Sequence, residues 1–189
     1  GTTAERVRLA RKLQALCREH HALFIVNDDP SIAAEVGADG VHVGQDDMSV
    51  AEVRTKYPSL KIVGLSTHNP DQARAAIPQK PDYIGCGPVW ATPTKDIPDP
   101  TLGVETAVAM AKSVPFPAVC IGGIDSGRLP ELIRAGAVNY AVVRAVSPCS
   151  ESATKKIGLL SNSIKYCREE LRQCLWDLRS EALEVSDMN

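Results

Sequence analysis

Residues 83–95 read Tyr-Ile-Gly-Cys-Gly-Pro-Val-Trp-Ala-Thr-Pro-Thr-Lys, and this stretch carries the pattern that decides the fold. It begins as an apolar strand that ends in glycines, and it continues as a loop with threonine hydroxyls and a lysine. Such a loop offers the N–H, O–H and ammonium donors that an anionic phosphate group needs. A polar loop directly after a buried strand is where α/β enzymes place their chemistry. Taken alone, the stretch is equally compatible with a surface turn that carries a lysine.

The order of an apolar strand, a polar or glycine-rich segment and a helix recurs six times before residue 150. Besides the strand that opens residues 83–95, strands are predicted at 22–26, 40–44, 61–65, 118–121 and 140–143. Helices are predicted at 4–19, 31–36, 49–57, 71–76, 104–114 and 129–135. Strands that alternate with helices predict a parallel sheet.

Two parallel architectures are compatible with this order, a TIM (β/α)8-type barrel and a doubly wound sheet. Polar residues follow nearly every strand, which favours the barrel, because its whole C-terminal rim is functional. A doubly wound sheet would concentrate such residues at one switch point. Six of the eight barrel strands are recognisable, and the chain begins on a helix, so two N-terminal strands are expected to be absent. We predict an α/β barrel domain over residues 1–150 and a C-terminal helical extension over 151–189.

In the extension, apolar residues recur alternately four and three positions apart. They are Leu160, Ile164, Cys167, Leu171, Cys174 and Leu178. A last barrel helix with an extension packed on the body is preferred over a coiled-coil partner site, because fewer than three full heptads are present.

Composition narrows the class of function. The net charge is −2 without a basic stripe, and 4% of residues are aromatic, so nucleic acid is an unlikely partner. The sequence shows neither an apolar run of roughly 18 residues nor a signal peptide at its start. The six cysteines lack C-x-x-C spacing, and Cys86 and Cys120 fit small core residues. We expect a cytoplasmic protein with small-molecule substrates and no membrane partner, and leave homo-oligomer formation open.

Five motifs occur in an order and spacing that resemble the thiamine-phosphate synthase family from about residue 4 to residue 150. They are Asn27-Asp28, Gly40–Asp47, Gly64–His68, residues 85–95 and Ile121–Ile124. The resemblance implies a transferase that condenses 4-amino-2-methyl-5-hydroxymethylpyrimidine diphosphate with thiazole phosphate, giving thiamine phosphate and pyrophosphate. It also implies a dissociative substitution, in which the pyrimidine C–O bond breaks first and the thiazole nitrogen captures the cation.

The resemblance assigns the diphosphate to residues that follow three early strands. Asp28 and Asp47 would bind one Mg²⁺, whose preferred partners are carboxylates and substrate phosphates. From the residues alone, the two aspartates could instead cap the helices that start near Pro30 and Ser49. Lys95 and Ser66 would be the catalytic residues. Lys95 would place a charge on the pyrophosphate, and Ser66 and Asn27 would donate hydrogen bonds to it.

The thiazole phosphate is assigned to later residues. Thr92 and Thr94 would contact it, together with backbone N–H groups at Gly123 and Val143. A tight strand-to-helix turn without a ligand is the alternative for Gly122-Gly123. His42 lies inside a strand and fits a core or supporting role better than a base. His68 lies nearer the rim, and Arg144 could reach a phosphate or pair with an acidic residue.

One departure from the family pattern leaves two alternative functions open. The family carries a Gln-x-Arg-x-Lys strand before the helix that opens this chain, and residues 1–189 lack it. A non-catalytic phosphate-binding remnant of the synthase is therefore one alternative. A thiazole tautomerase is another, but Pro88 stands where tautomerases carry a catalytic histidine, and Asp28 and Asp47 are retained.

Overall fold

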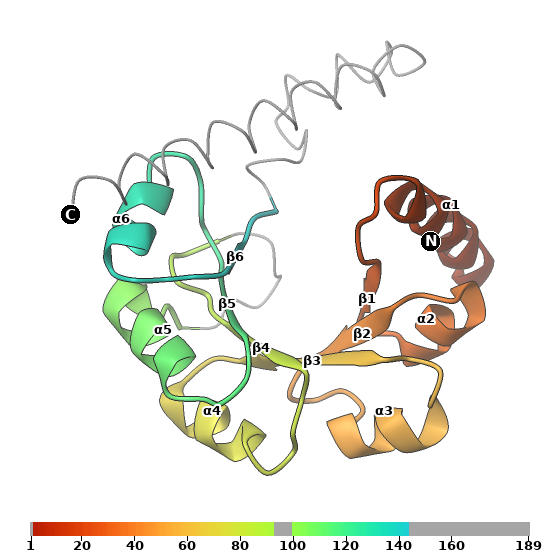
Figure 1. Cartoon of the computed structure of the whole chain (residues 1–189), viewed down its shortest axis with the longest axis horizontal. Coiled ribbons are helices and arrows are strands. Elements are labelled where there is room, and N and C mark those ends of the chain that lie inside the picture. The colour runs from red at the N-terminus through yellow and green to blue at the C-terminus, as the bar shows by residue number, and fades with distance from the viewer. Residues whose placement is uncertain (1, 93–99, 144–189) are drawn as a thin grey trace. The chain divides into compact units, whose positions relative to one another are not determined.

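The computed structural model describes residues 2–92 and 100–143 of the chain (Figure 1). The helices are α1 (Thr3–Glu19), α2 (Pro30–Val36), α3 (Val50–Lys56), α4 (Pro70–Ala76), α5 (Gly103–Lys112) and α6 (Leu129–Arg134). The strands are β1 (Ile25–Asn27), β2 (Gly40–Val43), β3 (Ile62–Thr67), β4 (Tyr83–Cys86), β5 (Ala118–Ile121) and β6 (Tyr140–Ala141). The predicted alternation of strands and helices is confirmed for these residues, although several ends shift.

The strands are parallel and follow one another in the sheet in chain order, from β1 to β6. Asn27 of β1 is paired with His42 of β2, and His42 is paired with Gly64 of β3. Gly64 is in turn paired with Tyr83 of β4. Residues in register across parallel strands share one face of the sheet, so these four positions form a row on that face.

The chain divides into two compact units. Unit one comprises residues 1–87 and 109–119, and unit two comprises residues 88–108 and 120–189. Residues 93–99 and 144–189 lie outside the described part of unit two, so the predicted boundary near residue 150 and the helical extension also lie outside the described residues.

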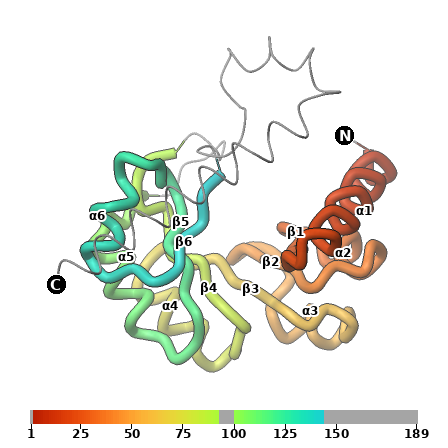
Figure 2. Tube along the Cα trace, turned by 45° about the horizontal axis from the view of Figure 1, so that its top comes forward, coloured from red at the N-terminus to blue at the C-terminus, as the bar shows by residue number. Residues whose placement is uncertain are grey.

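Unit one has a core between its strands and the helices that connect them. The strands contribute Val41, Val43, Val63, Leu65 and Ile84, all fully or nearly fully buried. The helices contribute Ile32, Ala33, Val50, Val53, Ala73 and Ala76. Each short helix therefore buries one face, as its apolar spacing predicts. α1 lies beside α2 in both views (Figure 1 and Figure 2), and its exposed leucines include Leu9, Leu13 and Leu16 within the described residues.

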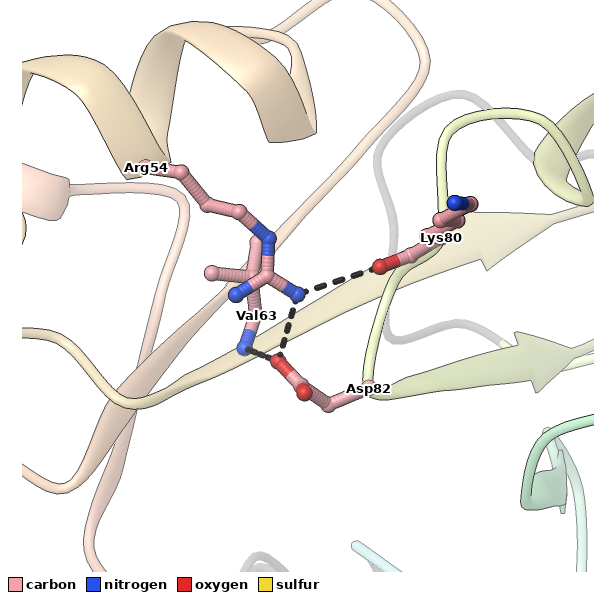
Figure 3. A network of polar contacts seen from close by, with 4 residues as sticks. All are labelled: Arg54, Val63, Lys80 and Asp82. Atoms are coloured by element: carbon pink, nitrogen blue, oxygen red, sulfur yellow. Dashed lines mark hydrogen bonds and ion pairs between the residues drawn. The ribbon is translucent and has the colours of Figure 1, made fainter.

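A polar network fixes the amino edge of unit one (Figure 3). Asp82 Oδ2 accepts a hydrogen bond from the backbone N–H of Val63 at 2.7 Å and pairs with the Arg54 guanidinium at 3.0 Å. Arg54 also donates to the carbonyl of Lys80 at 3.1 Å. These contacts tie α3 and β3 to the segment that enters β4.

The described part of unit two has buried residues on the first part of α5, the end of β5, α6 and the segments beside them. Buried residues include Val89, Ala107, Val108, Cys120, Ile124, Leu129 and Leu132. Cys86 of unit one and Cys120 are buried free thiols, which agrees with their interpretation as small core residues. Among the described residues, no helix combines the length and apolarity needed to cross a membrane.

Candidate active site

The predicted diphosphate residues of unit one lie on or after neighbouring strands. Asn27 ends β1 and Asp28 follows it, Asp47 follows β2, and Ser66 lies in the last part of β3. The predicted position of Ser66 at a strand end agrees with this, and the strand continues one residue past it to Thr67. Because these strands are parallel and in register, their carboxyl ends meet at one edge of the unit-one sheet. The structure therefore brings these four residues to a common edge.

Asp28 is exposed and adopts a left-handed backbone conformation, with φ 65°. Its backbone N–H donates to the carbonyl of His42 at 2.8 Å, which fixes Asp28 against the β2 strand. The N-cap of α2 is Asp29, whose side chain accepts a hydrogen bond from the N–H of Ile32 at 3.1 Å. The alternative in which Asp28 caps this helix is therefore wrong. A left-handed non-glycine residue is uncommon, although aspartate tolerates the conformation better than most.

Asp47 is exposed, and its carboxylate reaches back over the end of β2. Asp47 Oδ2 accepts a hydrogen bond from the backbone N–H of Gly44 at 2.7 Å. The N-cap of α3 is Ser49, which forms a capping box with Glu52. The alternative in which Asp47 caps α3 is therefore wrong as well. Neither aspartate of the predicted metal pair is needed to start a helix.

The donor chemistry of this pair fits magnesium. Residues 2–92 and 100–143 contain no group of three or more His, Cys, Asp or Glu side chains arranged to hold a metal ion. Mg²⁺ does not require such a group, because it is commonly held by one or two carboxylates together with substrate phosphates and water. Asp28 and Asp47 have carboxylates of the kind that such a site needs, and their role as ligands stays a prediction.

Ser66 lies in a hydrogen-bonded group that the sequence predicted only in part. Its Oγ atom lies 2.8 Å from His42 Nε2, and His42 Nδ1 lies 3.0 Å from the hydroxyl of Tyr83. The rings of His42 and Tyr83 stack with centroids 5.3 Å apart. Burial raises the pKa of the Tyr83 hydroxyl, so this phenol stays protonated at neutral pH. The supporting role predicted for His42 agrees with this geometry, whereas the contribution of Tyr83 was missed.

His68 has a separate position. Its Nδ1 atom lies 2.7 Å from the carbonyl of Gly87, and its backbone N–H donates to the side chain of Gln72 at 2.7 Å. Because a carbonyl only accepts, Nδ1 of His68 carries the proton in this contact. These contacts give His68 a structural role at the end of β3.

In unit two, a glycine pair lets two segments approach closely. Gly122 and Gly123 have φ 104° and 68°, a region that favours glycine. The backbone N–H of Trp90 donates to the carbonyl of Gly122 at 3.0 Å. A Cβ atom on Gly123 would lie 2.8 Å from the Cβ of Trp90. The backbone at Gly122-Gly123 therefore forms a tight turn, and whether this turn binds a phosphate stays a prediction.

Arg128 also contacts this turn. Its guanidinium donates to the carbonyl of Gly123 at 2.8 Å and lies 5.5 Å from the centre of the Trp90 ring. Sequence reasoning did not find this arginine, since no spacing rule connects it with a tryptophan on an earlier loop. A left-handed glycine turn aims successive N–H groups into one concavity, so turn formation and anion binding are compatible.

The remaining predicted phosphate residues of unit two are only partly described. Thr92 is half-buried and Val143 is exposed. Thr94 and Lys95 lie in residues 93–99, and Arg144 begins the C-terminal segment, so these three lie outside the described residues. Their roles stay predictions.

Comparison with known proteins identifies the family. The profile of the thiamine monophosphate synthase family matches residues 1–146. A thiamine-phosphate synthase from Synechocystis is 45% identical over 152 residues, covering 80% of this chain and 44% of that protein. One from Bacillus thuringiensis is 43% identical over 159 residues, covering 82% of this chain and 72% of that protein. The chain spans less than half the length of the Synechocystis relative.

A solved structure gives the fold class. Thiamine phosphate pyrophosphorylase from Pyrococcus furiosus superposes with a TM-score of 0.77 at 30% sequence identity, covering 98% of this chain and 79% of that one. The predicted TIM (β/α)8-type fold is confirmed, with six of its strands among the described residues. Fold, sequence profile and relatives agree, and the chain belongs to the thiamine monophosphate synthase family.

Proposed function

We propose that this chain catalyses the reaction named for its family. It would join a hydroxymethylpyrimidine diphosphate to a thiazole phosphate and release pyrophosphate. The observation that carries the proposal is the common edge of unit one, where Asn27, Asp28, Asp47 and Ser66 lie on or after three neighbouring strands. Barrel enzymes place their active-site side chains at the carboxyl ends of the parallel strands, which is where these amide, carboxylate and hydroxyl groups lie.

The proposed chemistry is a dissociative substitution. The C–O bond between the pyrimidine methylene and the diphosphate breaks, and its electron pair leaves with pyrophosphate. The lone pair of the thiazole nitrogen then forms the new C–N bond to the methylene carbon. Because this nitrogen carries no proton to remove, the reaction needs no strong base. It needs the growing charge on the pyrophosphate to be stabilised by positioned groups.

The unit-one residues match that requirement. The Asn27 amide and the Ser66 hydroxyl would donate hydrogen bonds to the diphosphate. Lys95, which belongs to unit two and lies outside the described residues, would contribute a positive charge. Asp28 and Asp47 would hold Mg²⁺, which when bound neutralises charge on the leaving group. The hydrogen bond from the backbone N–H of Gly44 already orients the Asp47 carboxylate. Binding of Mg²⁺ would therefore cost less side-chain conformational entropy at this residue.

The thiazole phosphate is assigned to unit two. Thr92, Thr94 and the backbone N–H groups of Gly123 and Val143 would bind it. Support comes from the left-handed turn at Gly122-Gly123, which follows the end of β5 as expected of an anion-binding turn. Arg128 is occupied by the Gly123 carbonyl and the Trp90 ring, so we assign it to shaping the turn.

The test is formation of thiamine phosphate by the 189-residue chain from its two purified substrates, with and without Mg²⁺. We expect product that depends on Mg²⁺, and a loss of on the order of a hundredfold in kcat/KM for Ser66→Ala, the range for one lost transition-state donor. Ser59→Ala, at an exposed site outside the predicted edge, is the matched control and should behave like the parent. Magnesium pyrophosphate binding without any product would identify a non-catalytic binding protein and overturn the proposal.

A further inference from the structure

The hydroxyl of Ser66 is held by a side chain that neither the predicted site nor the proposed mechanism uses. His42 stands between two hydroxyl groups, with Nε2 2.8 Å from Ser66 and Nδ1 3.0 Å from Tyr83. We propose that Tyr83 and His42 are positioning residues, which orient the Ser66 hydroxyl so that its hydrogen points to a diphosphate oxygen. The inference rests on the proposed function, in which Ser66 binds the diphosphate.

The contact between His42 and Tyr83 depends on the strand between them. His42, Gly64 and Tyr83 are in register across β2, β3 and β4. A Cβ atom on Gly64 would lie 2.2 Å from Cζ of Tyr83 and 2.5 Å from Nδ1 of His42. Real Cβ atoms do not approach other atoms so closely. Glycine at position 64 is therefore what allows the two rings to stack across the middle strand.

The two hydrogen bonds of His42 can run in either direction, depending on its tautomer, and the proposal requires one of these directions. The half-buried Tyr83 hydroxyl keeps its proton at neutral pH, so it can donate to His42 Nδ1. A neutral imidazole that accepts at Nδ1 carries its proton on Nε2, and this N–H donates to the Ser66 oxygen. The hydrogen of Ser66 is then left to donate to another acceptor.

The opposite direction would not serve a diphosphate. If Nδ1 carried the proton, Nε2 would accept the hydrogen of Ser66, and the serine would present its lone pairs to the ligand. Diphosphate oxygens are acceptors at neutral pH, so lone pairs facing them would repel. The orientation set by Tyr83 is thus the one that matches the chemical class of the ligand.

The backbone of Ser66 is fixed as well. The side-chain amide of Gln45 donates to the Ser66 carbonyl at 2.5 Å, and Ser66 is paired with Gly85 of β4. The neighbouring residue Thr67 is fully buried, and its hydroxyl donates to the carbonyl of Gly85 at 2.8 Å. Because the main chain is held on both sides, rotation of the Ser66 hydroxyl is the freedom that His42 removes.

The binding test uses magnesium pyrophosphate as the probe and compares two histidine replacements. Glutamine places an amide nitrogen near the position of Nε2 and can still donate to Ser66, whereas asparagine reaches only the position of Nδ1. We expect His42→Gln to bind within about threefold of the parent. We expect His42→Asn to weaken binding roughly tenfold, the loss for one hydrogen bond to a charged group.

A double-mutant cycle separates positioning from general destabilisation. If His42 acts through Ser66, His42→Asn should add nothing to the effect of Ser66→Ala. Additive losses, or parent-like binding by His42→Asn, would overturn the inference. Failure of the parent itself to bind magnesium pyrophosphate would instead count against the proposed function.

The tautomer of His42 gives a readout that needs no ligand. Nitrogen-15 chemical shifts of the imidazole should show the proton on Nε2 of His42, and Tyr83→Phe should shift the population toward Nδ1. His68 is an internal reference of the opposite kind, because its Nδ1 donates to the Gly87 carbonyl. A proton on Nδ1 of His42 in the parent would overturn the inference whatever the binding data show.

Discussion

The carboxylate of Asp29 accepts a hydrogen bond from the backbone N–H of Ile32, and this bond caps α2. Its neighbour Asp28 does not cap α2, and its backbone adopts a left-handed conformation directly after β1. Two adjacent aspartates therefore have different tasks, one in stability and one at the proposed metal site. Substitutions at the two positions should separate these tasks.

The first prediction concerns the cap. Asp29→Ala should lower the free energy of unfolding by about 1 kcal/mol, the usual cost of losing an N-cap. Asp29→Asn should be close to the parent at pH 7, because asparagine is an equally good cap. The ion pair with Arg6 at 3.2 Å is partly exposed and should contribute little. Urea unfolding measures both variants.

The cap also predicts a dependence on pH. The Ser31 hydroxyl, which donates to the carboxylate, is the main cause that holds the pKa of Asp29 below its ordinary value. A lowered pKa in the folded state means that this carboxylate stabilises the fold above its ordinary pKa of about 4. The contribution is lost as the pH falls through the folded pKa. Asp29→Asn should flatten this part of the curve of stability against pH, and an unchanged acid limb would contradict the assignment.

The second prediction concerns magnesium. Asp47→Asn should weaken Mg²⁺ binding in the presence of pyrophosphate on the order of tenfold or more, since a unit charge next to a cation is worth several kcal/mol at protein dielectric constants. Asparagine can still accept the bond from Gly44, so the turn should persist. Asp28→Asn should act similarly, because asparagine also tolerates the left-handed conformation.

The control for this pair is Asp46→Asn, which changes an exposed carboxylate next to Asp47. Its Mg²⁺ titration by calorimetry should match that of the parent. Equal weakening by all three substitutions would indicate a general loss of negative charge and would remove the specific role of Asp28 and Asp47.

The third prediction separates two costs of replacing a glycine in unit two, the cost of backbone strain and the cost of overpacking. Gly103 and Gly123 have φ 72° and 68°, but only Gly123 has neighbours that a Cβ would meet. Gly103→Ala should therefore cost only the strain of a left-handed alanine, about 1 kcal/mol. Gly123→Ala should cost this amount and a further 1–3 kcal/mol or so for overpacking.

Thermal unfolding of both glycine variants by circular dichroism gives the comparison. The difference between them reports the approach of Gly123 to Trp90. Two variants of equal stability would mean that this contact does not constrain the turn.

The fourth prediction compares how much each partner of one ion pair, Arg54 and Asp82, contributes to the free energy of unfolding. The Arg54 and Asp82 side chains are 41% and 40% exposed, so the pair itself should be worth no more than about 1 kcal/mol. Asp82 also accepts the N–H of the buried Val63, which would lose its partner in Asp82→Ala. An unsatisfied buried donor costs about 1–3 kcal/mol.

Asp82→Ala should therefore destabilise the chain more than Arg54→Ala. Asp82→Asn, which keeps an acceptor for Val63, should lie near Arg54→Ala in urea unfolding. A larger effect for Arg54→Ala would show that the ion pair, and not the bond to the strand, carries the stability of this edge.

Sequence reasoning reached the order of strands and helices because each buried strand is a short apolar run closed by polar or glycine residues. It could not choose the α2 cap, since Asp28 and Asp29 are adjacent and only backbone geometry tells which one faces Ile32. It also missed the contact of Tyr83 with His42, because two residues 41 positions apart meet only once strand register is known. Gly64, placed in the row between them, is the signal that could have suggested it.

The network around Asp82 has a practical consequence for redesign. Asp82 holds β4 to β3 where these strands begin, and the Thr67 hydroxyl joins them again at the carbonyl of Gly85. Exchange of residues 44–48 for the equivalent loop of another barrel enzyme would remove the bond from Gln45 to Ser66 but neither of these two contacts. Such a transplant could alter ligand preference while the pairing of β3 with β4 is kept.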